Sequence, residues 1–86
     1  MKKKIEVEIF SDQGNNAVLK LPGRKYPGIL IQGDSFGVIC KSADSILDLS
    51  RAGDKGLLDE IEMFAMNLRE IYQNYLDVLK ESGEDF

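Results

Sequence analysis

The chain has 86 residues, a length that allows one small domain over residues 1–86. Its residues are 43% hydrophobic and 30% charged, a composition too apolar for a disordered protein. It contains no histidine, so the commonest general base and the commonest zinc ligand are absent. It has a single cysteine, Cys40, so a disulfide framework is excluded. The sequence therefore predicts a protein that is not an enzyme and has no cofactor and no metal site.

The formal net charge of −4 is unevenly distributed along the chain. Residues 1–53 hold eight Lys or Arg and six Asp or Glu, whereas residues 54–86 hold three and nine. An acidic C-terminal half repels phosphate backbones, so nucleic acid is an unfavourable ligand and a basic protein is a favourable one. A solvated helix face that keeps the protein soluble is the alternative interpretation of the same charges.

The N-terminal lysines resemble the start of an export signal, but the residues that follow do not continue it. Glu6 and Glu8 interrupt the apolar run of about 7–15 residues that such a signal requires. No stretch of the sequence reaches the roughly 18–20 consecutive apolar residues of a membrane span. We therefore expect a cytoplasmic protein that does not contact a membrane.

Two strands are predicted at the start of the chain. Residues 4–10 alternate between apolar and polar side chains, which is the period of a half-buried strand. The residues of this strand expected to face the core are Ile5, Val7 and Ile9. Residues 11–16 are six turn-forming residues, and residues 17–21 resume an extended pattern, so the two strands should form an antiparallel hairpin.

A stiff loop and a third strand follow. Pro22-Gly23 and Pro27-Gly28 each fit the centre of a type II turn, in which proline fixes φ and glycine supplies a positive φ. Residues 28–32 are a short β-branched apolar run, which is typical of a strand buried on both faces in the middle of a sheet.

Residues 33–40 fit either a hairpin turn with a fourth strand or the start of a helix, and we interpret them as a helix. Asp34 or Ser35 can cap its first free N–H groups. Its apolar face is expected to collect Phe36, Ile39, Cys40, Ala43, Ile46, Leu47 and Ser50. Gly53 can end the helix in the left-handed conformation. In this register Cys40 is a buried structural thiol.

The last helix is predicted from residue 55 to residue 81. Its main apolar row has heptad spacing and consists of Leu57, Ile61, Phe64, Leu68, Ile71, Tyr75 and Val78. A second row beside it widens the stripe. At 1.5 Å per residue the helix is about 40 Å long, more than a body of this size can cover, so its C-terminal end should pack on another chain. A homodimer or a contact with a different protein would satisfy this requirement.

Seven residues are candidates for partner binding. Arg24, Lys25 and Tyr26 stand between rigid turns, and such side chains on a stiff loop make good interface anchors. Asp34 and Ser35 mark a helix start that could hold an anion with Arg24 as a clamp. Asp59 and Glu62 belong to the acidic C-terminal helix. Exposed turns and a solvated helix face are the simpler interpretation of all of them.

Segment 21–35, with Leu21-Pro22-Gly23-Arg24, Tyr26-Pro27-Gly28 and Ile31-Gln32-Gly33-Asp34-Ser35, resembles a small uncharacterised bacterial domain family with the pattern LPGR-x-[FY]-PG-x-x-[IV]QGDS. The turn into the helix is also similar to that of bacterial toxin-immunity proteins, and more faintly to HicB-type antitoxins. The resemblance to the uncharacterised family implies no particular activity, whereas the likeness to immunity proteins implies a protein that binds and neutralises a cognate toxin.

The sequence therefore predicts an α+β fold in the order β-β-β-α-α. A three-stranded antiparallel sheet is followed by two antiparallel helices packed on one face, the second of them long. The expected function is a non-catalytic protein-binding module of immunity or antitoxin type that contacts a basic partner such as a toxin. A self-assembling structural dimer and a small anion-sensing regulatory domain are the alternatives.

Overall fold

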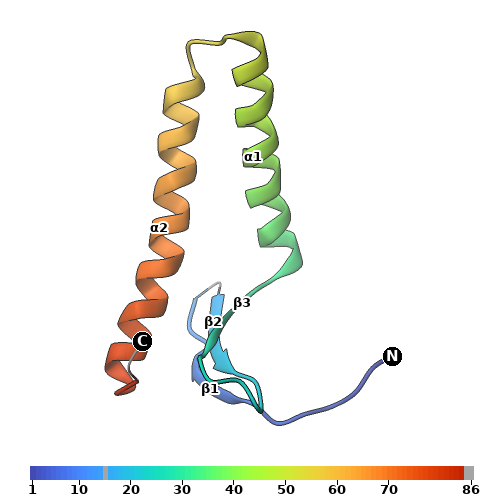
Figure 1. The fold of residues 1–86 in the computed structure, drawn as a ribbon, viewed down its shortest axis with the longest axis vertical. Coiled ribbons are helices and arrows are strands. Elements are labelled where there is room, and N and C mark those ends of the chain that lie inside the picture. The colour runs from blue at the N-terminus through green and yellow to red at the C-terminus, as the bar shows by residue number, and fades with distance from the viewer. Residues whose placement is uncertain (15, 85–86) are drawn as a thin grey trace. The chain divides into compact units, whose positions relative to one another are not determined.

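A computed structural model describes the structure of residues 1–14 and 16–84. Three strands, β1 (Glu8–Ser11), β2 (Asn16–Lys20) and β3 (Gly28–Ile31), are followed by two helices, α1 (Gly33–Ala52) and α2 (Leu57–Glu81) (Figure 1). The predicted fold class, the helical state of residues 33–40 and the long second helix are confirmed. Residue 15, within the predicted turn over residues 11–16, lies outside the described residues.

The chain divides into two compact units. The first, here the sheet unit, contains Met1–Ile31 and the last turns of α2 from Asn74. The second, here the helical unit, contains Gln32–Gln73, which includes all of α1 and the first part of α2.

The first strand is shorter than predicted and buries a different side chain. It begins at Glu8, and its pairing with β2 shifts register between Ile9 and Ser11. This bulge sets two residues of β1 against one of β2, so Phe10 turns toward the core and Ile9 is exposed. The prediction that Ile9 faces the core was therefore wrong, because alternation assumes an unbroken ladder.

The third strand lies at the edge of the sheet, not in its middle. The sheet has the order β1-β2-β3 with both pairs antiparallel, so β2 is central. Leu30 on β3 is exposed, which contradicts burial on both faces. Gly28 has no positive φ and pairs with Leu19, so the second predicted type II turn is replaced by the start of the strand.

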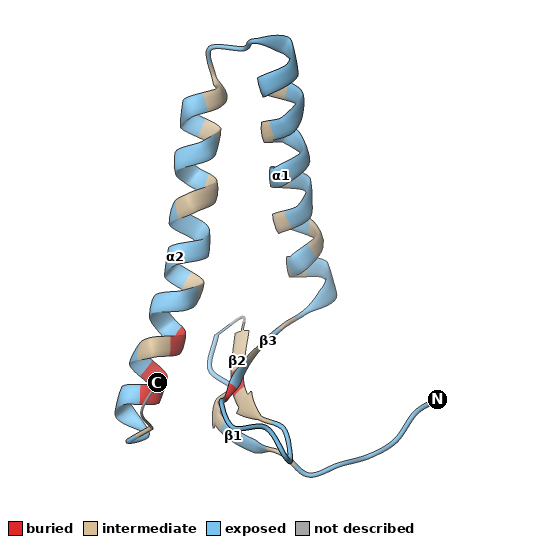
Figure 2. Ribbon diagram, in the orientation of Figure 1, coloured by how far each residue is buried: buried red, intermediate tan, exposed pale blue. Residues whose placement is uncertain are grey.

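The core of the sheet unit forms where the last turns of α2 pack on one face of the sheet. Val18, at the centre of β2, is 0% exposed, and Leu79 on α2 is 2% exposed. Tyr75 and Val78 complete this buried cluster, with Phe10, Ile29 and Leu76 packed against it. Figure 2 shows buried residues on the sheet and at this end of α2. The C-terminal end of α2 is thus covered within its own unit, and the expectation that it needs another chain was wrong.

The helix ends follow local chemistry. α1 closes at Gly53, which has φ 66°, and the N–H of Asp54 donates to the carbonyl of Leu49 at 2.9 Å. The Asp54 carboxylate then accepts the N–H of Gly56 at 2.7 Å, just before α2 begins at Leu57. The first cap differs from the prediction, since α1 is preceded by Gln32 with no side-chain cap bond.

The first helix has no buried residue along its 20 positions. Cys40 is exposed, so the prediction of a buried structural thiol was wrong. The other predicted members of this face that are exposed are Phe36, Ala43, Leu47 and Ser50. The partly buried apolar side chains of α1 are Ile39 and Ile46, which were predicted, and Leu49, which was not. The row that contains Cys40 lies uncovered beside them.

Candidate functional site

The turn at Pro22-Gly23 has the predicted type II geometry. Gly23 has φ 79°, and the N–H of Arg24 donates to the carbonyl of Leu21 at 3.2 Å. The turn holds Arg24 in an exposed position in the loop between β2 and β3.

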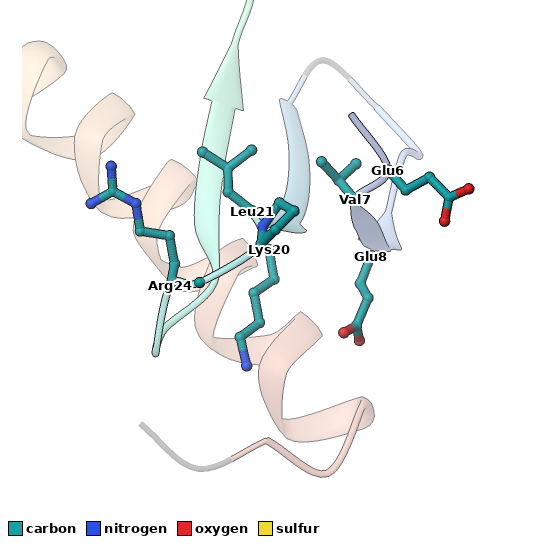
Figure 3. Close-up of a pocket in the computed structure, with 8 residues that line it drawn as sticks. Glu6, Val7, Glu8, Lys20, Leu21 and Arg24 are labelled. Carbon is teal, nitrogen blue, oxygen red and sulfur yellow. The ribbon is translucent and has the colours of Figure 1, made fainter. Parts of the chain in front are cut away.

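An open hollow of about 440 Å³ lies beside this turn and is lined by residues 6–8 and 20–24. Figure 3 shows the side chains of Glu8 and Lys20, which are cross-strand partners, extending in the same direction, whereas Arg24 points away from them. Two carboxylates, Glu6 and Glu8, balance the charges of Lys20 and Arg24 in this lining. The hollow therefore does not concentrate one sign of charge toward a small charged ligand.

The next residues of the loop are held by an aromatic contact and a buried hydrogen bond. The Nζ atom of Lys25 lies 5.3 Å from the centre of the Tyr26 ring, within the range of a cation–π contact. Behind them, the Tyr75 hydroxyl on α2 donates to the carbonyl of Pro27 at 2.7 Å in a buried position. The loop is thus tied to α2, while Lys25 and Tyr26 stay exposed.

The predicted anion site at the start of α1 is already engaged by a carboxylate. The Asp34 Oδ1 atom accepts the N–H of Ser35 at 2.9 Å. An incoming anion would have to displace this carboxylate from one of the free N–H groups of the first turn. Arg24, the proposed clamp, belongs to the sheet unit, whereas Asp34 and Ser35 belong to the helical unit.

Asp59 and Glu62 are exposed in the first two turns of α2, and Glu70 is exposed further along the helix. At about 100° per residue, Asp59 and Glu70 fall on one side of α2, with Glu62 at the edge of that side. The structure therefore distributes the predicted site residues over both units, with the loop cations in one and the carboxylates in the other.

Apolar side chains at heptad spacing form a surface of the helical unit that the site prediction missed. Each helix has a partly buried row, and in Figure 2 these rows face each other. Each helix also has a second row, here the exposed row. The exposed row of α1 consists of Phe36, Cys40, Ala43 and Leu47, and that of α2 of Leu58, Ile61, Ala65, Leu68 and Tyr72. All of these residues are exposed except Ala65, which is partly buried. The signal was present in the sequence as a stripe wider than one seam requires.

The described residues hold neither a cluster of metal ligands nor a membrane-spanning helix. Among residues 1–14 and 16–84, no three Cys, Asp or Glu side chains lie close enough together to hold a metal ion. Over the same part of the chain, neither helix has an apolar stretch long enough to cross a bilayer.

A family model, described as a family of unknown function (DUF6959), matches residues 2–86. The chain belongs to this family. The match covers the sheet unit and the helical unit together, so membership of a small domain family is confirmed. No curated protein and no solved structure matches the chain.

Proposed function

We propose that this chain is a non-catalytic protein-binding module whose helical unit contacts a basic protein partner. The observation that carries the proposal is the location of the net charge. Gln32–Gln73 hold eight Asp or Glu and four Lys or Arg, a formal charge of −4, whereas the remaining residues hold seven of each. The helical unit therefore carries the whole net charge of −4, and the sheet unit is neutral overall.

The carboxylates of this unit lie where a partner can reach them. On α2, Asp59 and Glu70 are exposed on the side turned away from both apolar rows, and Asp48 has the same position on α1. A basic partner would be attracted from a distance, so its association rate should be high and should fall as salt rises.

An immunity-like or antitoxin-like role, in which the chain holds a basic toxin, is part of the proposal. The resemblance of segment 21–35 and the acidity of the helical unit support it. The absence of histidine from the sequence and the balanced charges of the hollow beside Arg24 support a role without chemistry.

The test is purification of the tagged full chain from its native cells after gentle cross-linking, with the mass of each recovered species measured. We expect a second, basic polypeptide in stoichiometric amount. The charge reversals Asp59→Lys and Glu70→Lys together should reduce its recovery about tenfold or more, since close charge pairs at interfaces are worth about 1.5 kcal/mol or more each.

The matched control reverses two carboxylates of the sheet unit, Glu6→Lys and Asp12→Lys, with the same change in net charge. Recovery should be preserved in this control. Recovery of no basic polypeptide, or an equal loss in both double variants, would contradict the proposal that the helical unit is the docking surface.

A self-assembling structural dimer is the second candidate function. The exposed rows favour it, because large apolar side chains such as Phe36 and Leu58 lie uncovered on both helices.

A further inference from the structure

The exposed rows of α1 and α2 lie on the same side of the helical unit. Successive side chains of a helix are about 100° apart around its axis. In each helix the exposed row therefore lies roughly 100° from the partly buried row, and the direction of this rotation, viewed from the N-terminus, is the same in both helices. The two helices run in opposite directions (Figure 1), and their partly buried rows face each other. The same rotation in both helices therefore places the two exposed rows on one side of the helix pair. Together they make one apolar face without a charged residue.

Each exposed row has large side chains at both ends and small side chains at its centre, so the order of sizes is the same in either chain direction. In α2, Leu58 and Tyr72 stand at the ends and Ala65 at the centre. In α1, Phe36 and Leu47 stand at the ends, with the small residues Cys40 and Ala43 between them. A row of this kind is complementary to itself in antiparallel orientation, because its small centre allows close approach and its large ends meet each other.

We propose that a second copy of this chain covers this face, so that two helical units form a four-helix bundle about a two-fold axis near Ala65. Leu58 of one copy then lies opposite Tyr72 of the other, and Ile61 lies opposite Leu68. The inference rests on the proposed function, action through protein contact, and identifies one of the contacts as self-association.

The charges that flank the α2 row fit the same arrangement. Glu62 and Arg69 are seven residues apart at one edge of the row, and both are exposed. In an antiparallel pair centred near Ala65, Glu62 of each copy lies opposite Arg69 of the other. Opposite charges beside an apolar seam select the partner and its orientation. An open hollow of about 420 Å³, lined in part by Ile61, Ala65 and Arg69, leaves room for side chains of the second copy.

The first measurement is the mass of the full chain by size-exclusion chromatography with light scattering at submillimolar concentration. We expect twice the chain mass of 9.6 kDa. Ile61→Asp should return the mass to that of one chain with the helical circular dichroism retained, whereas Met63→Asp, on the same helix but outside both rows, should leave the dimer intact. A single-chain mass for the unaltered protein overturns the inference.

The second measurement locates the seam without a disruptive change. In a Cys40→Ser background, Ala65→Cys should be cross-linked between chains by a short bismaleimide about tenfold or more faster than Met63→Cys, since paired thiols have a high effective concentration. Equal rates in a dimeric protein overturn the proposed seam. A monomer that still recovers the basic polypeptide overturns the self-association alone, and a dimer that recovers none overturns the basic partner alone.

Discussion

The sheet unit and the helical unit bury their apolar side chains to very different degrees. In the sheet unit, Val18 and Leu79 are 0% and 2% exposed, in a core closed by three strands and the last turns of α2. In the helical unit, α1 buries nothing, and Leu58 on α2 is 64% exposed. Both helices are amphipathic, so the difference lies in what covers them. The sheet unit completes its own core, whereas the helical unit presents an apolar face that fits a second copy.

The largest expected effect breaks the core of the sheet unit. Leu79→Ala should lower the free energy of unfolding by about 2–5 kcal/mol, because it removes a fully buried side chain and leaves a cavity. Met63→Ala, an exposed residue outside both rows, should change it by no more than about 0.5 kcal/mol. Urea unfolding followed by circular dichroism, at one fixed protein concentration, measures both. Similar losses in the two variants would mean that the two units do not differ as described.

The next effect tests the link between the loop and α2. Tyr75→Phe should cost about 1–3 kcal/mol, because the buried carbonyl of Pro27 loses the hydroxyl that donates to it. The ring stays in place, so packing is nearly unchanged. Tyr26→Phe, in the exposed part of the same loop, is the matched control and should cost less. The same urea titration distinguishes them, and an unchanged midpoint for Tyr75→Phe would argue against the buried hydrogen bond.

Two glycines in the helical unit should respond with opposite signs. Gly53→Ala should destabilise by about 1–2 kcal/mol, because the left-handed φ of 66° is strained for any residue with a Cβ. Gly37→Ala should stabilise by about 0.5–1 kcal/mol, because this helical glycine has open space for a Cβ. Thermal unfolding at matched concentration reports both. A loss of stability for Gly37→Ala would show that α1 needs a small residue there.

The smallest effect concerns the exposed loop of the sheet unit. Lys25→Gln should cost no more than about 1 kcal/mol, since the cation–π contact with Tyr26 is solvent-exposed. Lys3→Gln removes the same charge from the N-terminal arm and should change stability less. The difference between the two melting temperatures isolates the contact, and a larger loss for Lys3→Gln would contradict it.

The sequence predicted most of the local features because their causes are local. The glycine after α1, the type II turn at Pro22-Gly23 and the heptad rows depend on neighbours within a few positions. The candidate site was predicted less well. Arg24 and Tyr26 are exposed as expected, but the exposed row that contains Cys40 was taken for core, since one helix pattern does not say whether its second row is covered.

The sequence by itself determined the order of the elements, the C-terminal ends of both helices and the acidity of the helical unit. Only the tertiary structure decided that Phe10 and not Ile9 faces the core, that β2 is the central strand and that the sheet covers the end of α2. The physical reason is that periodicity fixes the angle between side chains along one element. Which face is buried depends on the pairing register and on contacts with residues far away in the chain.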